Sequence, residues 1–434
     1  MNSVLNVKKL FSSELIRVSS LNAVATLIRM LTGFISVKVV ASLIGPQGIA
    51  VLGQLSNFSS ILLSISSGGI NAGITKYVSE YSDNKVFYNR FLGTGLWITL
   101  ALSFICSLVL IFGAGYFSTE ILHDVKYKIV FYIFGVTIIL YALNTLLISV
   151  INGFRDFKKY VIANILGSII GLIFSITLAL KFGILGALIA SVTYQSVLFF
   201  LTIIIVAKSH WFNYRSFVNK FDKGTAKKLA NYSLMAISSA VTVPGGQLIV
   251  RNFIIDYRSI SDAGIWEGMN RISGMYLTVI TTSLSVYFLP KLAQLKTNKE
   301  FKDEIFNAFK LIFPFLIVST IGIYLFRNLI IQILFTKDFV SMNELFGVQL
   351  LGDFLKLTGW VLGYILLAKA MAKTYIILEI FNFCLVVLSS YFLINRFGSL
   401  GATMAYTFVY FVYLILLIII FRKIIFEKDK KLND

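Results

Sequence analysis

The sequence has few charged residues and very few prolines, cysteines and histidines. Charged residues make up 14% of its 434 residues, whereas soluble domains average about 25%. Its 2 cysteines exclude a disulfide scaffold, and its 4 prolines and 57% hydrophobic residues exclude a disordered chain. With a mean hydropathy of +0.84, the chain is too apolar for a water-soluble fold. The composition predicts an integral membrane protein without a sizeable extramembrane domain.

Long apolar runs are the main feature that is present, and a helix needs about 20 apolar residues to cross a bilayer. We find such runs at residues 19–44, 49–74, 91–114, 129–152, 161–180, 185–206, 229–250, 263–290, 305–326, 345–368, 374–395 and 400–420. These runs predict an all-α membrane protein with 12 transmembrane helices. Because the number is even, both termini are expected on the same side.

The net charge of +19 is distributed unevenly between the two sets of connecting segments. One set, which includes both termini, holds 27 Lys and Arg residues, and the opposite set holds 8. Cytoplasmic loops carry the excess of basic residues, so both termini are predicted to be cytoplasmic. We assign the basic excess to topology and to anionic membrane lipids, not to nucleic acid. His123 and His210 fall on opposite sides, and we expect no metal and no cofactor.

The sequence repeats itself at an offset of 215 residues. The segment Phe182–Ala187 (FGILGA) aligns with Phe397–Ala402 (FGSLGA), and further matches keep the same offset without gaps. The alternative explanation is the biased composition of membrane helices. A duplication predicts two parallel six-helix repeats, residues 1–213 and 214–434. Transporters commonly bind substrate between such repeats, so we expect a central cavity.

Besides Lys310, which we count with the connecting segment 291–310, seven charged residues fall inside the predicted spans, where a charge costs about 2.5–3.5 kcal/mol on insertion scales. They are Arg29, Lys38, Arg271, Lys356, Glu267, Asp353 and Glu379. Such residues tend to face a water-filled interior and to mark a transport pathway. Several belong to polar stripes with helical spacing. The stripes include Asn22 and Arg29; Gln54, Asn57 and Asn71; Glu267 and Arg271; and Asp353 and Lys356.

Arg29 is the best candidate for binding an anionic substrate. It lies at the centre of its span and of its polar stripe, and no acidic residue is near it in the sequence. Lys38 lies nine residues further on, which places it on the opposite helix face. Its long side chain could instead extend to the outer membrane interface.

The other intramembrane charges have alternative roles as ion pairs. Lys356 is three residues from Asp353, and Arg271 is four residues from Glu267, both of which are pairing distances on a helix. Substrate contact is the alternative for both basic residues. Asp353, Glu267 and Glu379 are candidates for proton coupling.

One predicted helix contains the sequence Pro244-Gly245-Gly246. Proline removes a backbone donor and clashes with the preceding turn. The segment is therefore a candidate hinge or broken helix for alternating access, with a static kink as the alternative.

Motifs in the first two predicted spans resemble a known transporter family. They are Ile44-Gly45-Pro46-Gln47-Gly48-Ile49-Ala50-Val51-Leu52-Gly53-Gln54 and Gly69-Ile70-Asn71-Ala72-Gly73-Ile74-Thr75-Lys76-Tyr77-Val78. The chain resembles Wzx-type flippases of O-antigen and enterobacterial common antigen. These flippases belong to the MATE-like MOP superfamily, which also holds multidrug extruders and lipid II flippases.

The resemblance implies a non-enzymatic flippase in the bacterial inner membrane. Its substrate would be an undecaprenyl-pyrophosphate-linked oligosaccharide, which it would move from the cytoplasmic to the periplasmic leaflet. Membrane lipids and the polysaccharide polymerase machinery are the expected partners, and we expect a monomer. The alternative is a MATE-like exporter of a small solute, coupled to cations and dependent on acidic residues. A polymerase or glycosyltransferase would need a larger catalytic loop than this sequence offers.

Overall fold

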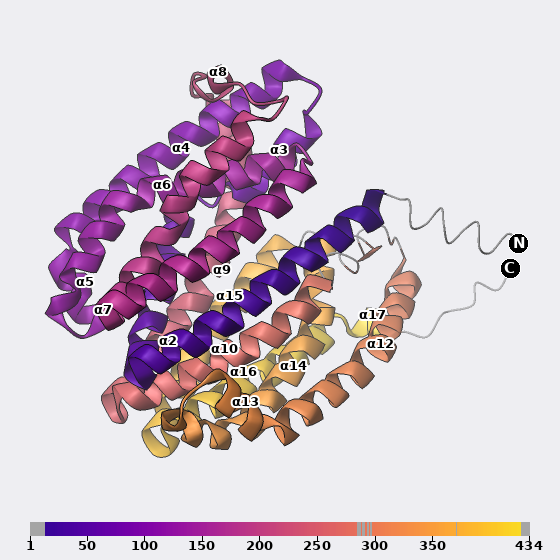
Figure 1. The fold of residues 1–434 in the computed structure, drawn as a ribbon. Helices are drawn as coiled ribbons and strands as arrows, with labels where there is room; N and C mark the ends of the chain where they lie inside the picture. Colours follow the sequence, from indigo (N-terminus) through magenta and orange to yellow (C-terminus); the bar gives the residue numbers. More distant parts are fainter. Residues whose placement is uncertain are drawn as a thin grey trace, which may run out of the picture. The chain divides into compact units, whose positions relative to one another are not determined.

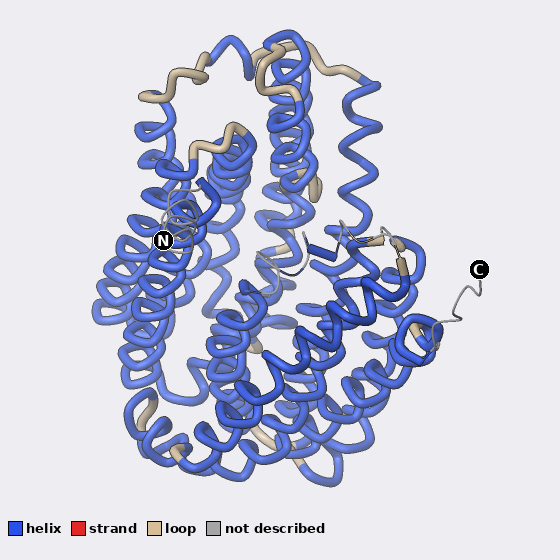
Figure 2. Tube along the Cα trace, turned by 90° about the vertical axis from the view of Figure 1, so that its right-hand side faces the viewer, coloured by secondary structure: helices blue, strands red, loops and turns tan. Residues whose placement is uncertain are grey.

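The computed structural model describes residues 14–283, 288, 291–292, 295, 297–369 and 371–426. This part of the chain contains helices, short loops and no strand (Figure 2). The longer helices are α2 (Glu14–Ser66), α4 (Lys85–Phe112), α6 (Lys128–Gly153), α7 (Phe157–Ala207), α9 (Lys223–Tyr257), α10 (Ile260–Ser283), α12 (Asn298–Leu325), α14 (Asn343–Ala368), α15 (Ala372–Phe397) and α16 (Ser399–Ile420). The shorter ones are α3 (Asn71–Glu80), α5 (Ala114–Leu122), α8 (Tyr214–Phe217), α13 (Arg327–Leu334) and α17 (Arg422–Phe426).

Within the described residues, 8 helices are long and apolar enough to cross a membrane. They confirm the prediction of an all-α, multi-pass membrane protein. Two of the eight, α2 and α7, each join two helices across a kink. The total of 12 spans arranged as two six-helix repeats stays a prediction.

Glycines in the left-handed region make both kinks possible. Gly45 has φ 62° and ψ −171°, and Gly183 has φ 59° and ψ −134°. A residue with a Cβ atom is strained in that region. The short loops predicted around residues 45–48 and 181–184 are therefore single-residue kinks within continuous chain.

The second predicted run, 49–74, is interrupted in the structure. Helix α2 ends at Ser66, and α3 begins at Asn71. Gly68 and Gly69, which lie between them, have φ values of 65° and 62°. The prediction of one uninterrupted helix was wrong here, because two consecutive left-handed residues cannot continue a right-handed helix.

The backbone carries the same local geometry at two places 215 residues apart. Gly398, the counterpart of Gly183, has φ 62° and ψ −138°. Three residues after each of these glycines stands another, Gly186 or Gly401. At both positions a Cβ atom would overlap a carbonyl of the helix before the kink. The offset found in the sequence thus relates equivalent turns of the backbone.

The chain forms two compact units. Unit 1 contains the chain up to Ile44 together with Val51–Gly245, and unit 2 contains Gly45–Ala50 and the chain from Gly246 onward. In unit 1, helix α6 packs against α3, α4 and α7 (Figure 1). The core at one end of this bundle includes Phe91, Leu147 and Trp211. The division into repeats at residues 213 and 214 stays a prediction.

Helix α14 is at the centre of unit 2. It packs against α10, α12, α15 and α16, and the core around it includes Leu277, Leu357 and Tyr413. Helix α10 also packs against α16. These contacts bring the polar faces of α10, α14 and α16 together, and most of the predicted intramembrane charges of this unit lie there.

Candidate functional site

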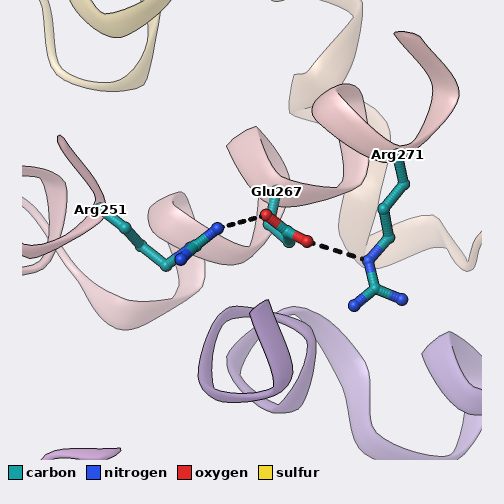
Figure 3. Close-up of polar contacts among 3 residues, drawn as sticks. All are labelled: Arg251, Glu267 and Arg271. Carbon is teal, nitrogen blue, oxygen red and sulfur yellow. Dashed lines mark hydrogen bonds and ion pairs between the residues drawn. The ribbon is translucent and has the colours of Figure 1, made fainter. Parts of the chain in front are cut away.

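Two arginines of unit 2 share one carboxylate. Arg251 on α9 and Arg271 on α10 donate to opposite oxygens of Glu267 (Figure 3). The distance from Arg271 Nε to Glu267 Oε1 is 3.1 Å. Arg251 is fully buried and stacks on Trp266, with 5.5 Å between Cζ and the ring centroid. The ion pair predicted for Arg271 and Glu267 is therefore present, and it is part of a triad.

The triad carries a net positive charge, because two guanidinium groups face a single carboxylate. Arg271 uses Nε for the ion pair, and its two terminal nitrogens point away from Glu267 in Figure 3. Its side chain is 21% exposed, whereas that of Arg251 is 0% exposed. Guanidinium groups bind phosphate through planar, multidentate donors. Arg271 is thus the member of the triad that can reach an anionic ligand.

Asp353 on α14 is buried and accepts hydrogen bonds from three hydroxyl groups. Ser273 Oγ and the Tyr406 hydroxyl each lie 2.6 Å from a carboxyl oxygen, and the Tyr276 hydroxyl also donates. Gln349 Nε2 lies 3.4 Å away. Burying a carboxyl group is costly unless it is hydrogen-bonded. These hydrogen bonds stabilise the Asp353 carboxyl group inside unit 2.

Lys356 does not pair with Asp353 among the described residues, although it lies one helical turn away. Its Nζ atom faces three aromatic rings, at 5.0 Å from Trp360, 5.3 Å from Tyr406 and 5.0 Å from Tyr410. Cation–π contacts of this kind stabilise an ammonium group inside an apolar region. The two alternatives for Lys356 were an ion pair with Asp353 and contact with the substrate. The structure describes both residues and does not contain the ion pair.

Arg29 in unit 1 is bonded to a neutral side chain. Its Nη2 atom donates to Asn164 Oδ1 of α7 at 2.9 Å. The exposed apolar residues Leu27, Leu31 and Ile35 lie on the opposite face of α2, as their spacing from Arg29 shows. No carboxylate pairs with Arg29 in the part of the chain that the structure describes. Its side chain is exposed.

The remaining predicted residues occupy varied surroundings. Lys38, Asn57, Asn71, Glu379, Pro244 and Gly245 are half-buried, and Gln54 and Gly246 are buried. Asn22 belongs to α2, but its side chain is outside the described residues. Helix α9 runs through Pro244 without a break. The boundary between unit 1 and unit 2 falls between Gly245 and Gly246. A hinge at this position stays a prediction.

Arg251 directly follows the predicted span 229–250, so the hydrophobic pattern assigned it to a connecting segment and not to the site. The structure instead places it inside α9, because that helix continues to Tyr257. A signal was available in the sequence. Arg251 and Glu267 lie at nearly equal distances on either side of the turn at Arg258–Ser259, and residues at such positions face each other in a helical hairpin.

Comparisons with known proteins identify the family. A family model described as polysaccharide biosynthesis protein matches residues 15–296. The chain belongs to this family. The lipid III flippase of Escherichia coli (strain K12) is 30% identical over 400 residues, which covers 92% of this chain and 96% of that protein. The lipid III flippase of Shigella flexneri matches to the same extent.

Solved structures show that this member of the polysaccharide biosynthesis protein family has the fold of the MOP superfamily. An inward-facing multidrug resistance MATE transporter matches with a TM-score of 0.75 at 14% identity, covering 92% of this chain and 97% of that one. The lipid II flippase MurJ, in an inward closed conformation, has a TM-score of 0.72 at 17% identity, with coverages of 94% and 90%.

Proposed function

We propose that this protein is a flippase for lipid-linked oligosaccharides of the bacterial inner membrane. Its substrate is an undecaprenyl-pyrophosphate-linked unit of O-antigen or a related glycan, which moves from the cytoplasmic to the periplasmic leaflet. The relationship to proteins named lipid III flippase supports the reaction. The observation that supports a negatively charged substrate is the Arg251–Glu267–Arg271 triad, because it contains two cationic groups and one anionic group.

A pyrophosphate group cannot cross hydrocarbon unaided, because it is anionic and strongly hydrated. In the proposed mechanism, Arg29 and Arg271 bind the pyrophosphate, and Lys356 and Lys38 add positive charge. The neutral side chains of Asn22, Gln54, Asn57 and Asn71 bind the sugars. Twelve helices in two six-helix halves, with both termini cytoplasmic, alternate access to a central cavity by bending at Pro244–Gly246. The monomer hands its product to the polysaccharide polymerase machinery.

Complementation of flippase-deficient bacteria tests this proposal. The wild-type gene should restore surface glycan in strains that build a suitable repeat unit. Arg29→Ala should abolish that glycan while the protein stays in the membrane at its normal level, whereas Lys181→Ala, an exposed basic residue of α7, should leave export unchanged. Wild-type export by Arg29→Ala would contradict the role of Arg29 in holding the anion.

A second candidate function is cation-coupled export of a small solute. The buried Asp353 favours it, because three hydroxyl groups hold its carboxyl group without an ion pair among the described residues. This function predicts that Asp353→Asn removes resistance to a toxic solute, and that the protein does not restore surface glycan. If Asp353→Asn still restored surface glycan, the carboxyl group of Asp353 would not be essential for transport, and this second function would be contradicted.

A further inference from the structure

The connection between α7 and α9 exposes apolar and basic side chains side by side. We call residues 214–223 the linker patch, and its exposed residues are Tyr214, Arg215, Val218, Lys220, Phe221 and Lys223. Val218 is 73% exposed, and Tyr214 is 64% exposed. Isolated apolar residues at a protein surface are common, but a row of them interleaved with cations is typical of segments that lie on membranes.

Hydrogen bonds fix the backbone of the linker patch on α4. Trp97 Nε1 donates to the Asn219 carbonyl at 3.2 Å, and the Asp222 N–H donates to Thr94 Oγ1 at 3.1 Å. Gly93 permits the close approach, because a Cβ atom there would lie only 2.6 Å from Asn219 Cβ. The exposure of the neighbouring Val218 and Phe221 therefore belongs to an ordered, docked segment.

The linker patch continues the apolar outer face of α4. Trp97, Phe104, Leu108 and Phe112 are exposed and share one helix face, which extends about 22 Å at 1.5 Å per residue. Tryptophan with an exposed ring and a bonded N–H is typical of the membrane–water interface. Trp97 thus marks the level of the lipid head groups, and the linker patch is bonded to it at that level.

We propose that the linker patch docks on the anionic phospholipids of the leaflet that it faces. Val218 and Phe221 enter the boundary of the acyl chains, and the ammonium and guanidinium groups of the patch bind lipid phosphates. Two observations favour lipid over a protein partner. The patch is continuous with the apolar face of α4, and its exposed charges are basic, while the nearby Asp222 is engaged by the Thr225 N–H at 2.7 Å. The inference depends only on the protein spanning a membrane.

Cysteine labelling in lipid nanodiscs tests the depth of the patch. The background protein carries Cys106→Ala and Cys384→Ala, to which either Val218→Cys or Lys223→Cys is added. Both side chains are exposed on the protein, so lipid alone can separate their reaction rates with a water-soluble maleimide. In nanodiscs of phosphatidylethanolamine and phosphatidylglycerol, we expect Val218→Cys to react about tenfold more slowly.

Equal labelling rates would place the linker patch in water and overturn the proposal. Protection of Val218→Cys in cell membranes that disappears in nanodiscs would also overturn it, because a protein partner would then be the occupant. Labelling of both variants after unfolding in detergent with denaturant shows that each cysteine is reactive.

Native mass spectrometry tests the binding of head groups. Arg215→Gln, Lys220→Gln and Lys223→Gln together should reduce the number of phosphatidylglycerol molecules retained, relative to wild type. The matched control combines Lys128→Gln, Lys181→Gln and Lys337→Gln, which are exposed lysines outside the linker patch. Equal retention by the two triple variants would contradict lipid binding by the patch.

Discussion

The two units bind their internal polar groups in different ways. In unit 1 the partners are neutral amides: inside it, Asn144 Nδ2 donates to Gln195 Oε1 at 2.8 Å, and the exposed Arg29 donates to the amide oxygen of Asn164. Unit 2 uses charges, with Glu267 between two arginines. The kinks at Gly183 and Gly398 have matching geometry, so the same local backbone occurs in two units with different interiors. The comparison teaches that a matching kink does not fix the interior of a unit, because the polar side chains of each unit set its chemistry.

The largest effect is expected from removing the carboxylate of the unit 2 triad. Glu267→Leu removes the carboxylate that pairs with the buried Arg251, which should destabilise the protein by about 3–5 kcal/mol. The thermal unfolding midpoint of the purified protein measures this loss. The unit 1 control is Asn144→Leu, which removes a neutral hydrogen bond and should cost about 0.5–1.5 kcal/mol.

A double variant sharpens this comparison. Arg251→Leu with Glu267→Leu removes both buried charges, so it should be more stable than Glu267→Leu alone. If Glu267→Leu and Asn144→Leu lowered the unfolding midpoint equally, the charged interior of unit 2 would not depend on its polar contacts more than the neutral interior of unit 1 does.

A smaller effect tests what the units share. Gly186→Ala and Gly401→Ala each place a Cβ atom against a backbone carbonyl, so both should destabilise by about 1–3 kcal/mol. Gly274→Ala on α10 is the control, since nothing lies within 4 Å of a Cβ atom there. If only one of these two substitutions lowered the unfolding midpoint, the two kinks would be equivalent in their backbone angles but not in their packing.

Substitution of Asn164 should make the surroundings of Arg29 resemble those of Arg271. Asn164→Asp gives Arg29 a carboxylate partner that competes with an anionic substrate, so glycan export should fall by about tenfold. Asn164→Ala should have a smaller effect, because it introduces no carboxylate that competes with the substrate. Export assays at matched protein levels provide the measurement, and equal export by the two variants would argue against anion binding at Arg29.

The smallest effect is expected at Asp222 of unit 1, whose carboxylate contributes to the stability of the fold. Hydrogen bonds from the side chain and N–H of Thr225 lower the pKa of Asp222, with a contribution from Arg90. A lowered pKa means that the ionised form stabilises the fold, and that this stabilisation is lost as the pH falls through the folded-state pKa. Asp222→Ala should therefore lower the unfolding midpoint slightly at neutral pH and have no effect below that pKa. A constant effect at all pH values would contradict this.

The sequence alone predicted much of the candidate site. Helical spacing identified the Arg271–Glu267 pair, because residues four apart always share a helix face. It could not identify Asn164 as the partner of Arg29, since the two are 135 residues apart. The same limit hid the hydroxyl groups around Asp353, which come from two other helices. The absence of a Lys356–Asp353 pair, one of the two alternatives for Lys356, has the same cause. Tyr406 donates to the carboxyl group of Asp353, and its ring also faces the ammonium group of Lys356.

Hydrophobicity and charge along the chain determined that this protein spans a membrane as helices, because backbone groups in lipid must be satisfied within each segment. The repeat at 215 residues likewise predicted equivalent turns. Only the tertiary structure decided which charges are buried, paired or exposed. Arg29, Arg251 and Arg271 are chemically identical, but their partners differ. Arg29 contacts Asn164 of a helix that is distant in the sequence, whereas Arg251 and Arg271 share Glu267, which lies on the next helix and on the same helix respectively.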